Sequence, residues 1–291
     1  MYKRQGEQAA ELKTIPGYDP ARPVRGFIYD MEEFMRKNVE NYLTRSKTTA
    51  KNLSAKAATP FLDESKFQLG CQISPADEAA FVARKRQKKA PADNKMNTDA
   101  ASIIMQTMYP ARLARPELLR AVGHLAQFLT KWTDRQDKQL HRLMSYIQRA
   151  CTDKLIGFIG DQPADLELSL YSDADFAGDR DDLKSTSGGF LALTGTHSFF
   201  PLGFLSKKQS CQSHSTPEAE LVACDACVRT LGFPALQLWE KLLGRSVRLR
   251  VFEDNEATLR IIQSGRFPTL RHVKKAHGLS IMTLHEWSEN N

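Results

Sequence analysis

The stretch that decides the predicted fold is Leu166-Glu167-Leu168-Ser169-Leu170-Tyr171-Ser172-Asp173-Ala174-Asp175. Its leucines alternate with polar residues, and successive side chains of a strand point to opposite faces of a sheet. The pattern therefore predicts a half-buried strand that ends in carboxylates. Asp173 and Asp175 would share one face of this strand, and the residues alone leave open which of the two serves a site.

A regular series of elements is predicted after this strand. Short apolar runs bounded by turn residues predict further strands, and Ser215-Thr216-Pro217-Glu218 is a capping-box pattern that predicts the start of a helix. The expected elements are strands at 166–175, 188–193, 197–205 and 247–252, and helices at 215–231 and 255–264. Their order, β-β-β-α-β-α, predicts a mixed α/β fold in which the first three strands form a meander.

This order would bring acidic side chains from separate elements to one place. Asp173 ends the first strand, Glu220 lies on the first helix, and Asp254 follows the fourth strand. Mg²⁺ is a hard cation that prefers carboxylate and water oxygens, and a few carboxylates facing a phosphate suit two-metal hydrolysis of a phosphodiester. An isolated Asp at the end of a strand is more often a cap or turn residue, so the three acids alone are weak evidence.

Helical spacing separates the two glutamates of that helix. Glu220 shares a face with Ala223, Cys224 and Cys227, which is the apolar side expected to pack on the sheet. Glu218 points elsewhere and is assigned to the capping box. The Cys224-x-x-Cys227 pair lacks a second pair of ligands at zinc-finger spacing, so we expect core packing and no zinc.

The first half of the chain has a different sequence pattern. Residues 29–43 have the apolar spacing of an amphipathic helix, residues 48–97 are polar with a basic run at 84–89, and residues 98–151 predict two or three packed helices. The basic run is interpreted as a solvated loop. We therefore expect a mainly helical region before the α/β part.

The charge and the cysteine content limit the classes of protein to which the chain can belong. The chain has 41 Lys and Arg against 34 Asp and Glu, a net charge of +7 and an isoelectric point near 9.1, which suits a polyanionic partner. Five scattered cysteines argue against a secreted disulfide framework. We find no signal peptide and no apolar stretch that approaches the length needed to span a bilayer, so a soluble, intracellular protein without membrane contact is expected.

Three segments resemble successive blocks of the ribonuclease H (RNase H) domain of copia-type retrotransposons, in the same order. They are YSDADFAGDRDDLKSTSGGF at 171–190, FLSKKQSCQSHSTPEAELVA at 204–223 and FEDNEATLRII at 252–262. Two upstream segments, at 56–65 and 101–129, are similar to the region that follows the polymerase palm. The resemblance implies a Pol polyprotein fragment with a reverse-transcriptase remnant and basic linker at 1–98, a thumb- or connection-like helical region at 99–160 and an RNase H-like domain at 161–291.

The resemblance also implies a function and its residues. The expected activity is hydrolysis of RNA in RNA–DNA hybrids with Mg²⁺ or Mn²⁺, with Asp173, Glu220 and Asp254 as metal ligands and catalytic acids. Reverse transcriptase or other Pol parts are expected partners, and a cytoplasmic virus-like particle or the nucleus is the expected location. A merely solvated basic surface is the alternative to phosphate binding. The expected phosphate contacts are Lys184, Lys207, Lys208, Arg266, Arg271, Lys274 and Lys275, and the expected contacts to 2′-hydroxyls are Ser185, Ser187 or Asn255.

The chain departs from the family pattern at two points. It lacks a Tyr-x-Asp-Asp palm motif, so no polymerase activity is expected. Lys274 stands where family members often carry a fourth metal-site Asp, which should weaken the second metal. His272 or His277 could move protons near the leaving group instead, although a surface histidine beside lysines is an equal alternative. Two rival functions follow: a non-catalytic remnant that binds nucleic acid, or an interaction domain that positions a polymerase encoded elsewhere.

Overall fold

The computed structural model describes residues 24–61, 96, 98–178, 182–266 and 277–290. Contacts divide the chain into two compact units. Residues 1–29 and 155–291 form the unit that contains the sheet, and residues 30–154 form the helical unit. The three-part division expected at residues 98 and 160 stays a prediction.

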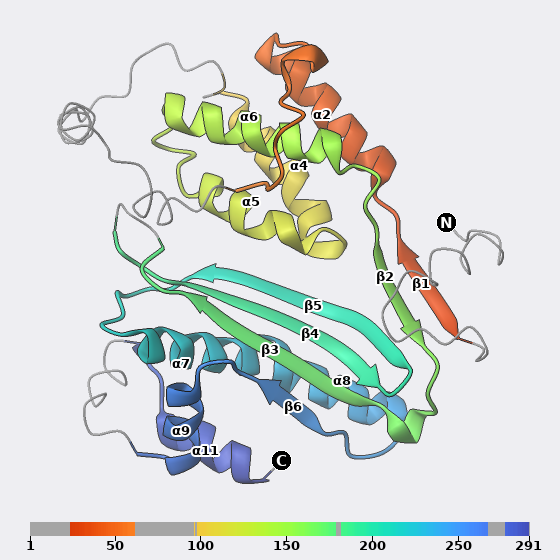
Figure 1. Cartoon of the computed structure of the whole chain (residues 1–291), viewed down its shortest axis with the longest axis vertical. Coiled ribbons are helices and arrows are strands. Elements are labelled where there is room, and N and C mark those ends of the chain that lie inside the picture. Colours follow the sequence, from red (N-terminus) through yellow and green to blue (C-terminus); the bar gives the residue numbers. More distant parts are fainter. Residues whose placement is uncertain (1–23, 62–95, 97, 179–181, 267–276, 291) are drawn as a thin grey trace. The chain divides into compact units, whose positions relative to one another are not determined.

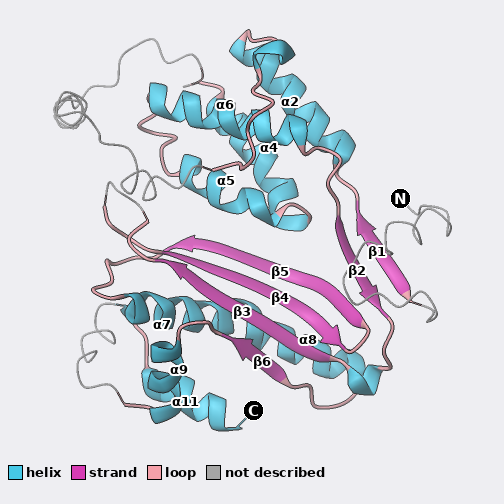
Figure 2. Ribbon diagram, viewed as in Figure 1, coloured by secondary structure: helices cyan, strands magenta, loops and turns pink. Residues whose placement is uncertain are grey.

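One six-stranded mixed sheet organises the first unit (Figures 1 and 2), with the strand order β1-β2-β5-β4-β3-β6. Neighbouring strands are antiparallel except for β3 and β6, which are parallel. The strands are β1 (Arg25–Tyr29), β2 (Leu155–Ile159), β3 (Glu167–Asp175), β4 (Thr186–Gly195), β5 (Ser198–Lys208) and β6 (Leu249–Phe252), with a short 3-10 turn, η4 (Pro163–Asp165), between β2 and β3. The fold is thus mixed α/β, as the sequence predicts.

The predicted meander is confirmed. β3 pairs with β4 over its whole length, from Glu167 opposite Thr194 to Asp175 opposite Thr186, and β4 pairs with β5. Leu168 and Leu170 are fully buried whereas Tyr171 is exposed, so the alternation of the strand separates a core face from an open face.

Helices α7 (Thr216–Cys227) and α8 (Phe233–Leu243) run along the core face of the sheet, joined by the π-helical turn η5 (Val228–Gly232). Leu170, Leu249 and Cys227 meet in the core between them. The prediction ended this helix at about residue 231. That end is wrong, because the single π turn lets the helix continue to Leu243 instead of breaking it.

The helical run Thr216–Leu243 also corrects an expectation about membranes. It is 28 residues long, and an 18-residue window within it has a mean hydropathy of 1.3, which makes it long and apolar enough, by those measures, to cross a bilayer. The expectation that no stretch approaches that length is wrong. Leu221, Ala223 and Cys224 of this run are buried in the cores of the sheet unit, and 33% of its apolar window is buried.

Among the described residues, two further helices belong to the sheet unit. α9 (Glu256–Ser264) follows β6, as predicted, and α11 (Ile281–Asn290) packs against it. Asn255 caps α9, because its side-chain oxygen accepts a hydrogen bond from the Thr258 N–H at 3.1 Å. A small core that includes Leu221 of α7, Ile261 of α9 and Leu284 of α11 joins these helices.

The second unit is helical, as predicted, around a core that includes Met35, Ile104 and Leu143. Thr133 caps the longest helix described in this unit, which begins at Asp134, with a full capping box to Gln136. Its elements are α2 (Glu32–Ser46), η1 (Ala50–Asn52), α4 (Ala100–Leu113), η3 (Pro116–Leu118), α5 (Leu119–Ala126) and α6 (Asp134–Arg149).

Strands β1 and β2 flank the helical unit in the chain and were not predicted. They pair with each other, Arg25 opposite Ile159, and β2 joins β5 through Phe158 opposite Phe199. The sheet therefore begins before residue 161, and part of the region expected to be helical is strand. A five-residue apolar run gives no clear periodicity, and these two segments lie 130 positions apart at Arg25 and Leu155, so local pattern could not pair them.

Candidate metal centre

Three acids from three elements converge at one end of the sheet. Asp173 of β3, Glu220 of α7 and Asp254, two residues after the end of β6, each offer a carboxylate oxygen, and these oxygens lie within 4.8 Å of one another. Asp173 and Asp254 are exposed, whereas Glu220 is only 4% exposed. The predicted convergence of these three side chains is confirmed, and their roles remain predictions.

The topology explains why these acids meet. β3 and β6 are parallel, so their carboxyl ends lie at the same edge of the sheet, and Tyr171 is registered with Phe252. Asp173 and Asp254 each stand two residues beyond that registered pair. α7 packs against β3 and β4 and carries Glu220 in its second turn, on the side that faces the sheet.

The structure also distinguishes Asp173 from Asp175, which the sequence left open. Asp173 belongs to the group of three acids, and Asp175 does not. Asp175 is the last residue of β3 and is paired with Thr186, while its carboxylate lies against Gly178 in the following loop.

The environment of Glu220 is unusual for a carboxylate. Burial, together with the negative charges of Glu253, Asp173 and Asp254, raises the pKa of Glu220 to about 8. The backbone N–H of Ala174 donates a hydrogen bond that acts in the opposite direction. The Oε2 atom of Glu220 is buried without a hydrogen-bond partner among the described residues.

This environment fits a divalent cation. A buried carboxylate oxygen without a donor is costly, and so is the repulsion between neighbouring carboxylates. A hard cation would satisfy the oxygen and cancel the repulsion, and all the ligand atoms offered are oxygens, as Mg²⁺ or Mn²⁺ prefers. Asp173, Glu220 and Asp254 are therefore the residues that could hold such an ion.

Glu253 is a fourth acid at this end of the sheet that sequence reasoning missed. Its charge is the first of the neighbouring charges that raise the pKa of Glu220, and burial raises the pKa of Glu253 itself. It accepts hydrogen bonds from Ser172 Oγ at 2.9 Å and from the Asn255 N–H at 3.3 Å. The available signal was the doublet Glu253-Asp254 directly after a strand.

His277 is held by Glu218 in the structure. Its Nε2 lies 3.2 Å from Glu218 Oε1, and both side chains are almost completely buried. His277 is not a member of the group formed by Asp173, Glu220 and Asp254. Its predicted role in proton transfer stays a prediction, and the alternative of a surface histidine is wrong for His277.

The capping box predicted for Glu218 forms only in part. Ser215 Oγ accepts from the Glu218 N–H at 3.4 Å, as expected of the cap. The Glu218 carboxylate, however, accepts from the His214 N–H at 2.9 Å, one residue before the cap, and also contacts His277. Glu218 therefore ties the start of α7 to the segment that carries His277.

The described residues among the expected nucleic-acid contacts differ in exposure. Lys207 is exposed, and Lys184 is half-buried. Lys208 forms an ion pair with Asp182 at 2.8 Å. Arg271, Lys274, Lys275 and His272 lie outside the described residues, as does the basic run at 84–89.

The three polar residues expected near 2′-hydroxyls have structural partners. Ser185 is fully buried, and its Oγ accepts a hydrogen bond from the Ala177 N–H at 3.1 Å. Ser187 is buried and accepts from Gln209. Asn255 uses its side-chain oxygen to cap α9. A contact of Ser185 or Ser187 with a nucleic acid would require these side chains to become exposed.

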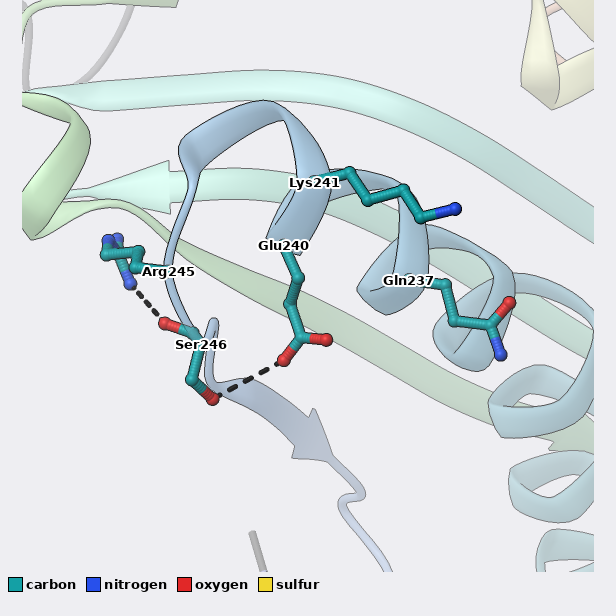
Figure 3. A pocket seen from close by; sticks show the side chains of 5 residues that line it. All are labelled: Gln237, Glu240, Lys241, Arg245 and Ser246. Atoms are coloured by element: carbon teal, nitrogen blue, oxygen red, sulfur yellow. Dashed lines mark hydrogen bonds between the residues drawn. The ribbon is translucent and has the colours of Figure 1, made fainter.

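Two other features lie outside the group of acids. Cys224 and Cys227 are buried in the core between α7 and the sheet, as predicted, and burial raises the pKa of both thiols to about 12. The pocket in Figure 3 lies at the end of α8 and contains none of the three acids. Its lining residues are Gln237, Glu240, Lys241, Arg245 and Ser246.

Comparison with known proteins shows two kinds of relative, although no family model matches the sequence. Over 123 residues, the chain is 34% identical to the retrovirus-related Pol polyprotein from transposon RE1 of Arabidopsis thaliana and 32% identical to that from transposon TNT 1-94 of Nicotiana tabacum. These matches cover 42% of this chain but only 8% and 9% of the polyproteins. The chain thus spans less than a tenth of their length.

The second kind of relative is shorter. Secreted RxLR effector protein 161 of Plasmopara viticola is 33% identical over 137 residues, which are 44% of this chain and 84% of that protein. The sheet, its flanking helices and the converging acids define a mixed α/β protein with a candidate metal centre. By sequence, the chain belongs to the family that includes this effector protein, and part of it is related to the Pol polyproteins of copia-type retrotransposons.

Proposed function

We propose that the sheet unit is an RNase H-like domain that cleaves the RNA strand of RNA–DNA hybrids with Mg²⁺ or Mn²⁺. The observation that carries this proposal is the convergence of Asp173, Glu220 and Asp254, from a strand, a helix and a loop, on one point. The relation to retrotransposon Pol polyproteins supports it, because hydrolysis of a hybrid is the activity that the sequence blocks at 171–190, 204–223 and 252–262 imply.

The chain's own residues would act in distinct ways. Bound divalent ions supply an activated water and neutralise charge on the leaving oxygen. Glu220, buried and held by the Ala174 N–H, would form the fixed inner side of the site. Asp173 and Asp254 are exposed and would face the substrate phosphate. His277, held by Glu218, would stabilise the fold around the site by tying its own segment to the start of α7.

Substrate binding would be electrostatic. Lys207 is exposed on β5, next to Ser187 of β4, and a lysine there can contact a backbone phosphate. Lys184, Lys208, Arg271, Lys274 and Lys275 are further candidates from the sequence. A reverse transcriptase or another Pol part is the proposed protein partner, and an intracellular site, in a cytoplasmic particle or the nucleus, is the proposed location.

The test is cleavage of a hybrid whose RNA strand carries an end label. We expect the purified chain to cut the RNA strand in the presence of Mn²⁺ or Mg²⁺, and Asp254→Asn to abolish cleavage while the protein stays folded. Glu256→Gln is the matched control, because Glu256 lies two residues away on an exposed surface and pairs only locally with Arg260. An uncut hybrid, under conditions in which a known RNase H works, would refute the proposal.

A second candidate function is favoured by one observation in the sequence. Lys274 stands where the resemblance expects a fourth metal-site acid. A chain without that acid could bind nucleic acid through its basic residues without cutting it. Salt-dependent binding of the hybrid without cleavage by the wild-type chain would select this function over the first.

A further inference from the structure

A side-chain hydrogen bond joins the two residues that precede two of the three acids. Ser172, which precedes Asp173, donates from Oγ to Glu253 Oε2 at 2.9 Å. Glu253, which precedes Asp254, also accepts from the Asn255 N–H through Oε1 at 3.3 Å. One carboxylate therefore ties the end of β3 to the loop that carries Asp254.

This bond lies where the backbone pairing of β3 with β6 ends. Among the described residues, the last registered pair of these strands is Tyr171 and Phe252. Ser172 and Glu253 stand one residue further along each strand, and the two acids stand one residue further again. The side-chain bond thus holds the two segments together one residue beyond the last pair of the ladder.

The surroundings favour a persistent bond. Ser172 is 7% exposed and Glu253 is half-buried, so water competes little for either group. A hydrogen bond to an ionised acceptor in such a setting is stronger than one between neutral groups in water. Glu253 is not a member of the group of three acids, and both of its oxygens are already engaged by donors.

We propose that Glu253 is a positioning residue of the candidate metal centre, which fixes the separation of the Asp173 and Asp254 carboxylates through Ser172 and Asn255. The inference rests on the proposed function only in that the three acids must bind a divalent ion. The competing explanation is that Glu253 acts solely by its negative charge, which would attract cations without any contribution from Ser172.

Three variants separate these explanations. Glu253→Gln removes the charge but keeps both bonds available, because its amide oxygen can accept from the Asn255 N–H and its amide N–H can donate to the Ser172 hydroxyl. Ser172→Ala keeps the charge and removes the bond to β3. Glu253→Ala removes both. Thermal unfolding of each variant establishes that it is folded before metal is added.

The measurement is the affinity for free Mn²⁺, followed by loss of the free-ion electron paramagnetic resonance signal. We expect Glu253→Ala and Ser172→Ala to weaken Mn²⁺ binding by about tenfold or more, as loss of a group that orients a ligand does. Glu253→Gln should remain much closer to the wild type. The double variant Ser172→Ala/Glu253→Ala should lose little more than Glu253→Ala, because both changes remove the same bond.

Two results would overturn the inference while leaving the proposed function intact. One is wild-type affinity in Ser172→Ala and Glu253→Ala, alongside loss of binding in Asp254→Asn. The other is equal weakening in Glu253→Gln and Glu253→Ala with no effect of Ser172→Ala, which would establish the charge explanation. A wild-type chain that binds no Mn²⁺ at the three acids would overturn both the inference and the metal-dependent function.

Discussion

Two glutamates in the first turns of α7 show how neighbouring residues come to serve different purposes. Glu218 and Glu220 are 0% and 4% exposed, respectively. Glu218 faces donors, the His214 N–H and the His277 imidazole. Glu220 faces Asp173, Asp254 and Glu253 instead, and its Oε2 has no hydrogen-bond partner among the described residues. Glu218 therefore stabilises the fold, whereas Glu220 is a source of instability that a cation would relieve.

Neutralising Glu220 should have the largest effect. In Glu220→Gln we expect cleavage of the hybrid and Mn²⁺ affinity to fall by at least about 100-fold, because a buried ligand of the ion is lost. Without metal, the variant should be at least as stable as the wild type at pH 8, because a charged group that burial and like charges disfavour has been removed. Cleavage assays and thermal unfolding measure both effects, and a strongly destabilised variant would contradict the assignment.

The pH dependence of stability tests the raised pKa of Glu220. The pKa of Glu220 is raised to about 8 in the fold, from 4.5 in the unfolded chain. The folded state therefore binds more protons than the unfolded state between these values, and the contribution of Glu220 to stability falls as pH rises from about 4.5 to about 8. Without metal, we expect a loss on the order of a few kcal/mol across this range. Denaturant titrations at several pH values should show this slope in the wild type and a flatter one in Glu220→Gln.

A second variant removes the carboxylate of Glu218, for which we expect the opposite result. We expect Glu218→Ala to destabilise the fold by on the order of 3 kcal/mol, because it leaves the His214 N–H and the buried His277 side chain without their acceptor and opens a cavity. The remaining folded molecules should bind Mn²⁺ with an affinity close to that of the wild type. If Glu218→Ala instead removed Mn²⁺ binding without any loss of stability, the roles of the two glutamates would have to be exchanged.

The smallest expected effect concerns a surface cation. Lys207→Ala should weaken hybrid binding modestly and reduce the slope of log affinity against log salt by about one, because one phosphate contact is lost. Lys241→Ala is the control, since Lys241 is also exposed but lines the pocket at the end of α8. Salt titrations of fluorescence anisotropy measure both slopes, and equal slopes for the two variants would remove Lys207 from the proposed surface.

Much of this arrangement could be predicted from local patterns. The alternation at 166–175 predicts β3 and places Asp173 at its end, and helical spacing chooses Glu220 over Glu218 for the sheet-facing side. Both predictions hold because burial of leucines and of the apolar face of a helix depends on periodicity within one element.

What could not be predicted depends on contacts between distant segments. β1 and β2 are too short to show a periodic signal. They pair with each other although the whole helical unit separates them in the sequence. Glu253 acquires its place only when β6 lies beside β3 and Ser172 comes within reach. For His277 the sequence left open a role in proton transfer or a place at the surface, but Glu218, 59 residues away in the sequence, holds it in a buried position.

A single metal site formed by three acids from three elements can be tested directly by Mn²⁺ titration of the single variants Asp173→Asn, Glu220→Gln and Asp254→Asn. One shared site predicts that the wild type binds Mn²⁺ and that each variant loses most of this affinity, with double variants losing far less than the sum of the single losses. A variant among the three that binds Mn²⁺ as tightly as the wild type would contradict the claim.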